Sequence, residues 1–174
     1  MTFKKTWAKL ARVLLLSLTI VPVVVFATGE ASLEVRLVQA LSIKNNGPER
    51  LAKSRPVIVA YKRAGILSKQ ADARADYVDF YLLRKPASFL GHPLVLLEEE
   101  YMDTYVGCCV SPGLGLVVQV NGDTRTMHDF AEKNACTLTP HADVIGTLKT
   151  YGIRNKLPKV DYAALSCRER DAQK

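Results

Sequence analysis

Two consecutive cysteines, Cys108 and Cys109, lie between two apolar segments, and no other feature of the sequence constrains the fold as strongly. Residues 94–97 and 114–120 are apolar, and each has the length of a short strand. The Ser-Pro-Gly sequence at 111–113 is typical of a turn. The region is therefore predicted to form the central hairpin of the fold, with both cysteines close to it.

The chain has four cysteines, and the remaining two are Cys136 and Cys167. An even number of cysteines in an exported protein predicts disulfides, and four cysteines allow three pairings. A bond between Cys108 and Cys109 requires a strained eight-membered ring. Neighbouring residues on a strand point to opposite faces, so one of these two can reach Cys136 and the other Cys167. We therefore expect two long-range disulfides, and both pairings of that kind stay open.

Residues 1–27 have the pattern of a secretory signal peptide. Residues 13–26 are apolar but shorter than the roughly 20 residues that a transmembrane helix needs, and Ala27 provides a small residue for cleavage. We expect a periplasmic or secreted protein with no stable membrane span after cleavage; an uncleaved membrane anchor is the alternative. The positive charges that precede the apolar segment are Lys4, Lys5, Lys9 and Arg12.

The net charge of the whole chain is +7, from 24 basic and 17 acidic residues. Residues 1–27 contain four of the basic residues and no acidic residue, so the exported part has a net charge of +3. A strongly basic domain would favour nucleic acid or an anionic membrane as a partner. A charge of +3 gives little support for either, and no nucleic-acid partner is predicted.

Residues 28–174 contain no internal repeat and no linker, which predicts a single globular domain large enough for a hydrophobic core. Consecutive strands joined by short turns favour an antiparallel sheet, and helices gathered at the end favour the α+β class. The predicted fold is a small antiparallel sheet with C-terminal helices pinned by disulfides. The expected strands are 57–61, 77–83 and the hairpin; the expected helices are 31–44 (with a strand as the alternative), 127–135, 139–151 and a short one from Asp161 that carries Tyr162, Leu165 and Cys167.

An acidic run and nearby tyrosines form the most distinctive polar feature. Three adjacent carboxylates repel one another, which favours a negative surface for a basic partner or a cation. The alternatives are a solvated strand edge, where charge prevents aggregation, and tyrosines packed across neighbouring strands. Tyrosine is enriched at the centres of protein interfaces. The candidate partner-binding residues are Glu98, Glu99, Glu100, Tyr101, Asp103 and Tyr105.

No catalytic, metal or cofactor motif is present, and we predict none of these sites. The adjacent cysteines lack the two-residue spacing typical of zinc ligands. Gly113 and Gly115 lack the further residues of a phosphate-binding loop. The most specific enzymatic alternative is a small envelope hydrolase that uses His92 or His141 with a carboxylate from 98–100.

Export, disulfides, modest size and the absence of a catalytic motif together favour a protein-binding domain. We expect it to bind another envelope or secreted protein, as an inhibitor or immunity-type protein does. A structural component of the envelope is a further alternative, which predicts self-association.

Overall fold

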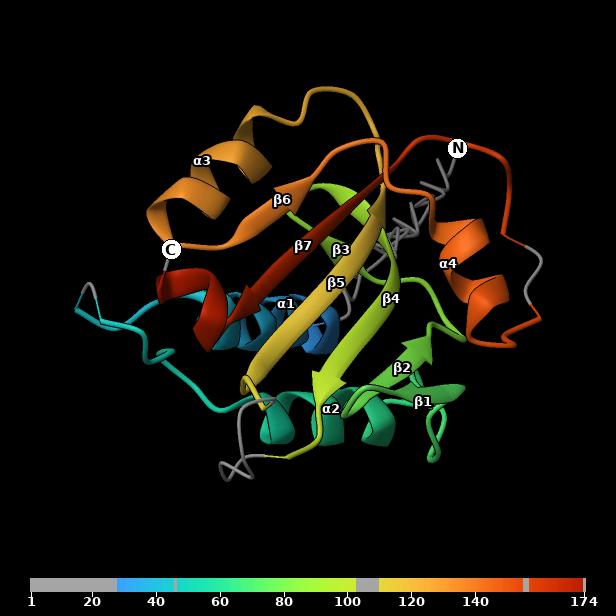
Figure 1. Cartoon of the computed structure of the whole chain (residues 1–174), viewed down its shortest axis with the longest axis horizontal. Helices are drawn as coiled ribbons and strands as arrows, with labels where there is room; N and C mark the ends of the chain where they lie inside the picture. Colours follow the sequence, from blue (N-terminus) through green and yellow to red (C-terminus); the bar gives the residue numbers. More distant parts are fainter. Residues whose placement is uncertain (1–27, 46, 103–109, 155–156, 174) are drawn as a thin grey trace, which may run out of the picture.

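The computed structural model describes residues 28–45, 47–102, 110–154 and 157–173. An antiparallel sheet of seven strands forms the centre of the molecule (Figure 1). Six of the strands follow the order β1-β2-β4-β5-β7-β6, and β3 pairs only with β4. The strands are β1 (Ala73–Ala75), β2 (Val78–Leu82), β3 (Ser88–Phe89), β4 (His92–Glu100), β5 (Gly113–Gln119), β6 (Thr137–Thr139) and β7 (Tyr162–Arg168).

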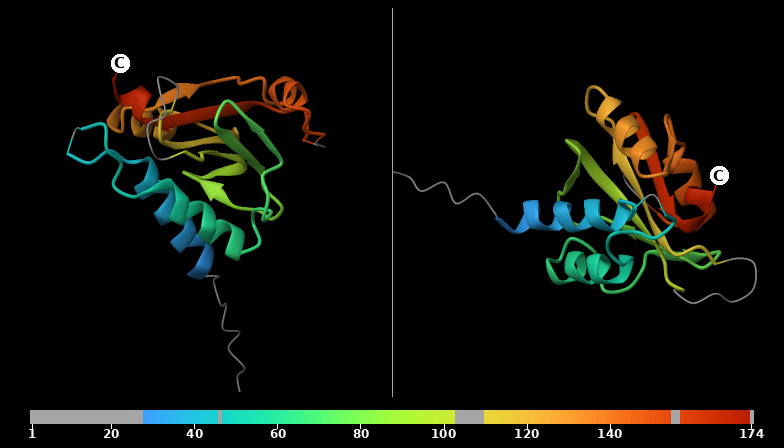
Figure 2. Two further views of the ribbon diagram at one scale, coloured as in Figure 1. Left: turned by 60° about the horizontal axis from the view of Figure 1, so that its bottom comes forward. Right: turned by 90° about the vertical axis from the view of Figure 1, so that its left-hand side faces the viewer.

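Helices cover both faces of the sheet, and the combination of helices with an antiparallel sheet confirms the predicted α+β class. The helices are not gathered at the C-terminal end as expected, because α1 and α2 precede every strand of the sheet. The helices are α1 (Thr28–Leu41), α2 (Ser54–Arg63), α3 (Arg125–Lys133), α4 (Val144–Thr150) and a C-terminal 3₁₀ helix, η1 (Glu169–Gln173). Figure 2 shows α1 and α2 side by side on one face. Buried residues of α1, α2 and α3 form one apolar core with that face, and buried residues of α4 form a second core with the other face.

The two central strands, β4 and β5, contribute to both cores, as the apolar segment 94–97 predicts. Leu94 and Leu97 lie in the first core and Leu96 lies in the second. The pairing register between β4 and β5 shifts between Leu94 and Leu96. Such a β-bulge re-aims the side chains that follow it, which explains how residues spaced by three point to the same face.

The predicted strand at 57–61 is wrong, because these residues belong to helix α2. Val57, Ile58 and Tyr61 are buried together on one side of the helix. Pro56 lies in the first turn, where a missing backbone N–H costs little. Burial of this face against the sheet outweighs the strand preference of the β-branched residues.

The predicted helix after Asp161 is also wrong, because Tyr162–Arg168 forms strand β7 between β5 and β6. Ala163 and Leu165 face the first core, whereas Tyr162 faces the second. The alternation of residues between the two cores is the period of a strand, and pairing on both sides satisfies its backbone groups.

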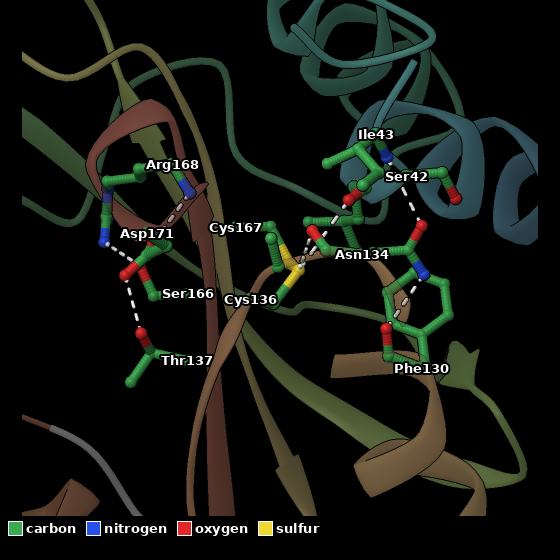
Figure 3. The surroundings of a disulfide bond; sticks show 12 residues. Ser42, Ile43, Phe130, Asn134, Cys136, Thr137, Ser166, Cys167, Arg168 and Asp171 are labelled. Atoms are coloured by element: carbon green, nitrogen blue, oxygen red, sulfur yellow. Dashed lines mark hydrogen bonds between the residues drawn. A yellow bond between two sulfur atoms is a disulfide. The ribbon is translucent and has the colours of Figure 1, made fainter. Parts of the chain in front are cut away.

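A disulfide joins Cys136 and Cys167, whose Cα atoms lie 4.4 Å apart (Figure 3). Cys136 immediately precedes β6, and Cys167 lies on the neighbouring strand β7. Both predicted long-range bridges are therefore wrong, because each of these cysteines uses the other as its partner. Cys108 and Cys109 lie outside the described residues. The bond links β7 to the segment that precedes β6. The structure therefore does not show the predicted pinning of the C-terminal helices by disulfides.

Arg50 connects three segments around this disulfide. Its Nη1 donates to the carbonyl oxygens of Leu41 at 2.9 Å and Asn134 at 2.6 Å. Its Nη2 donates to the carbonyl oxygen of Arg168 at 3.0 Å. The ends of α1, α3 and β7 are thus held together by one guanidinium group beside the disulfide.

The predicted signal peptide at 1–27 lies outside the described residues. Within the described part of the chain, no helix combines the length and the apolar character needed to cross a bilayer.

Candidate functional site

The acidic run 98–100 ends the central strand β4, where each residue pairs with a neighbouring strand. The alternative of a solvated strand edge is therefore wrong. Glu99 and Glu100 are only 1% and 4% exposed, respectively. Carboxylates can be buried in a sheet only where cations compensate their charge or where they stay protonated. The surroundings of Glu98, Glu99 and Glu100 differ in this respect.

Two recesses lie beside this end of β4, and together we call them the charged cleft. The larger recess has a volume of about 540 Å³ and the smaller one about 360 Å³. Arg55 and Tyr101 line both. The other charged residues of the larger recess are Glu49, Arg50, Lys53, Glu99, Glu100 and Glu169; those of the smaller recess are Lys62, Lys69, Arg74 and Asp79.

Glu99 and Arg55 form an ion pair in the wall of the larger recess. Nη1 of Arg55, on α2, donates to Oε2 of Glu99 at 3.0 Å. The side chain of Arg55 is 64% exposed, so the pair joins a buried carboxylate to a cation on the surface. Burial raises the pKa of Glu99, and the positive charges of Arg55 and Lys62 oppose that rise.

Glu100 has a different environment, although it also lines the larger recess. Both of its carboxylate oxygens are buried, and neither has a hydrogen-bond partner among the described residues. Burial raises the pKa of Glu100, and the more distant charges of Arg168 and Arg170 lower it. A carboxylate in this position favours the protonated form more than an exposed one does.

Glu98 is not a wall residue of the cleft. Its Oε2 accepts a hydrogen bond from Nη2 of Arg168 on β7 at 2.8 Å, above Gly115 of the intervening strand β5. Arg168 also donates through its backbone N–H to Asp171, which places the pair within a structural network.

A second network of polar side chains lines the smaller recess. Arg74 on β1 donates to both oxygens of Asp79 on β2, at 2.6 and 2.9 Å. The Tyr81 hydroxyl donates to Asp79 at 3.0 Å and accepts from Nζ of Lys62 at 3.0 Å. Burial alone would raise the pKa of Asp79, but the hydrogen bonds from Arg74 and Tyr81 and the charges of Arg74 and Lys62 outweigh burial and lower it. Burial and the charge of Asp79 raise the pKa of the Tyr81 hydroxyl, which stays protonated.

Tyr101 lies at the boundary between the recesses and is partly exposed. The guanidinium carbon of Arg74 lies 3.9 Å from the centre of the Tyr101 ring, a cation–π contact. The ring centre of Tyr77, in the turn between β1 and β2, lies 6.4 Å from the ring centre of Tyr101. The Tyr101 ring is thus held against the guanidinium group of Arg74 and borders both recesses.

The predicted partner-binding residues are therefore divided by the structure. Glu99, Glu100 and Tyr101 come together at the cleft, Glu98 points to a different network, and Asp103 and Tyr105 lie outside the described residues. The cations of the cleft on α2 and β1 were not predicted from the sequence. One signal was available, because Asp79 is the only charge within an otherwise apolar strand, and a charge in that position requires a partner.

The two candidate catalytic histidines do not meet these carboxylates. His92 is buried, and its Nδ1 accepts from the backbone N–H of Asn121. His92 lies six residues before Glu98 on β4, which corresponds to roughly 20 Å along a strand. Nδ1 of the exposed His141 lies 2.9 Å from Oδ1 of Asp161. The predicted histidine–carboxylate pair is thus not formed among the residues that the structure describes.

The described residues include no group of three or more His, Cys, Asp or Glu side chains that could hold a metal ion. Comparisons of the chain with protein-family models, with curated proteins and with solved structures found no match. The function is therefore argued from the charged cleft itself.

Proposed function

We propose that the protein is an exported protein-binding domain of the inhibitor or immunity type, and that the charged cleft is its recognition surface. A segment of an envelope or secreted partner would enter the two recesses. The observation that carries the proposal is the position of Tyr101 and Arg55, which line both recesses at their common boundary.

Tyrosine and arginine are the residue types enriched at the energetic centres of protein interfaces. Each combines a large contact area with a polar group that can bond to a partner. Arg55 is mostly exposed at its side chain, and Tyr101 is partly exposed. Both are therefore accessible to a bound segment within the described structure.

The cleft is also preorganised, which lowers the entropy lost on binding. Arg55 is fixed by the buried Glu99 at 3.0 Å, and Arg74 is fixed by two hydrogen bonds to Asp79 and by the ring of Tyr101. These side chains have lost much of their rotamer freedom before any partner arrives. Rigid walls of this kind are typical of domains that bind one partner tightly.

The charges exposed in the structure favour a partner of the opposite charge from the one expected from the sequence. The sequence predicted a basic partner for the acidic run, but Glu99 and Glu100 are buried. The exposed charged residues that line the cleft are four cations and one carboxylate, Glu49, whose Oε2 lies 4.0 Å from Nζ of Lys44 (the cations are Lys53, Arg55, Lys69 and Arg74). A partner segment with acidic side chains therefore fits the accessible charges better than a basic one.

The test begins with capture of a partner by the oxidised protein from an envelope extract of its own source, identified by mass spectrometry. The partner is then purified, and its affinity is measured by calorimetry for the wild type and for Tyr101→Ala and Arg55→Ala. We expect each substitution to weaken binding by about tenfold or more, as substitutions at interface centres do. Lys149→Ala on α4, which packs on the opposite face of the sheet, is the control and should leave affinity unchanged.

Unchanged affinity in both folded cleft variants would contradict the proposal. Capture of no partner, together with concentration-dependent self-association, would instead support a structural envelope component. Turnover of an envelope substrate by the protein would support the hydrolase alternative.

A further inference from the structure

We propose that the smaller recess is a binding site for an oxyanion, the chemical group shared by phosphate, sulfate and carboxylate. The site does not depend on the proposed function, because a free anion could occupy it without a partner protein. The residues that line this recess have an excess of positive charge, and several of their N–H donors are left to bond a ligand.

The smaller recess has more positive than negative charge. Its four cationic residues face a single carboxylate, that of Asp79 (the cations are Arg55, Lys62, Lys69 and Arg74). Asp79 pairs with Arg74, and Glu99 of the neighbouring recess pairs with Arg55. Two lysines, Lys62 and Lys69, have no ion pair among the described residues.

Lys62 is held at the recess by neutral contacts. Its Nζ donates to the Tyr81 hydroxyl at 3.0 Å and lies 4.3 Å from the centre of the Tyr81 ring. An ammonium group has three N–H donors, and the hydroxyl accepts only one of them. The remaining donors have no hydrogen-bond partner among the described residues, and the carboxylates of Glu99 and Asp79 act on Lys62 only through their charge. Burial lowers the pKa of Lys62 in spite of these charges, so an anion bound at the free donors would stabilise its ammonium group.

The carboxylate of Asp79 does not oppose an anion strongly, because its oxygens are already occupied. Oδ1 accepts from Nε of Arg74, and Oδ2 accepts from Nη2 of Arg74 and from the Tyr81 hydroxyl. Arg74 compensates this charge within hydrogen-bond distance. A ligand in the recess therefore meets the ammonium groups of Lys62 and Lys69 and the side-chain amide of Gln70, a set of donors suited to oxygen acceptors.

The test is a titration of the oxidised, isotope-labelled protein with inorganic phosphate, sulfate and acetate, at constant ionic strength set with chloride, followed by NMR. We expect saturable shifts of the backbone signals of Gln70, Ala71 and Arg74 with at least one of these anions. Lys69→Met, at an exposed position, and Lys62→Met should each weaken the affinity by about tenfold, the loss expected when a charge-assisted hydrogen bond is removed.

Lys149→Met on α4 is the matched control and should leave the affinity unchanged. Lys69→Met keeps the test valid if Lys62→Met fails to fold, because Lys69 is exposed and lies in the loop between α2 and β1. Binding of phosphate and sulfate alone would assign the site to a phosphoryl or sulfo group, and binding of acetate as well would extend it to carboxylates. Absence of saturable shifts with all three anions, or equal affinity in both lysine variants and the wild type, would overturn the proposal.

Discussion

Replacement of both cysteines of the Cys136–Cys167 disulfide by alanine should destabilise the protein strongly. The two residues are separated by 31 positions in the sequence. Closing a loop of this length restricts the unfolded chain, and the loop-entropy relation gives about 3.7 kcal/mol at 25 °C. For a domain of this size, such a loss lowers the melting temperature by roughly 10 °C.

The loss is measured by urea denaturation of the oxidised wild type and of the double variant, with the m-value compared between them. A loss below about 1 kcal/mol would refute the loop-entropy argument. A non-reduced tryptic digest tests the pairing itself. The structure predicts that peptide 134–149 is joined to peptide 160–168. Either long-range pairing would instead join these peptides to 85–125, which contains Cys108 and Cys109.

Two further substitutions test the interior of the sheet. A Cβ atom at Gly115 would lie 2.6 Å from Oε2 of Glu98, so the Glu98 side chain would have to move away from Nη2 of Arg168, its donor at 2.8 Å. Loss of this bond to the buried Arg168 should lower the free energy of unfolding of Gly115→Ala by roughly 1–3 kcal/mol. Gly47→Ala, with its nearest contact at 3.4 Å, is the control, and equal losses in the two variants would contradict this reasoning. Glu100→Gln should raise the free energy of unfolding at pH 7, because burial raises the pKa of Glu100 above its ordinary 4.5 and the native state binds the proton more tightly than the unfolded state. The stability that protonated Glu100 gives the wild type is lost as pH rises through the raised pKa. The difference in free energy of unfolding between Glu100→Gln and the wild type should therefore shrink as pH falls toward 4.5. Urea denaturation across pH measures this difference, and the exposed control Glu132→Gln should show no such trend.

The central strands could be predicted because their signals are local. The aromatic strand near Tyr81 and the two apolar segments of the hairpin have the length and composition of strands, and the structure places β2, β4 and β5 there. The helices α1 and α3 were predicted from apolar periodicity and helix-start signals in the same way. In these segments, local preference and tertiary burial agree.

The predicted helix 139–151 begins later than expected, because Thr139 ends β6 and α4 covers Val144–Thr150. Two other segments adopt the opposite type of structure from that predicted, and these two errors have one cause. Val57 and Ile58 have strand preferences, and Ala163 and Ala164 have helix preferences, yet each pair adopts the other structure. In α2, one buried face decides the structure, and in β7, pairing with strands on both sides does. Contacts with distant segments thus outweigh intrinsic preferences of less than 1 kcal/mol per residue.

The charged cleft could not be predicted because its pairs are distant in sequence. Arg55 and Glu99 are 44 residues apart, and Glu98 and Arg168 are 70 residues apart. The sequence therefore presents three adjacent acids as one negative surface. The fold separates them into an ion pair with α2, a network with β7 and one carboxylate with no hydrogen bond among the described residues. Among the described residues of the predicted set, Glu99 and Glu100 are buried, whereas Tyr101 is partly exposed beside the cleft.

The most direct test of the proposed function is photo-crosslinking in the cells that produce the protein, with a benzophenone amino acid at position 101. Tyr101 borders both recesses, whereas Val160, the control position, is 42% exposed, lies two residues before the start of β7 and lines neither recess. We predict a single light-dependent adduct of defined mass from position 101, absent from position 160 and lost when Arg55→Ala is added. The same adducts from both positions, or none from position 101, would contradict the assignment of the charged cleft as the recognition surface.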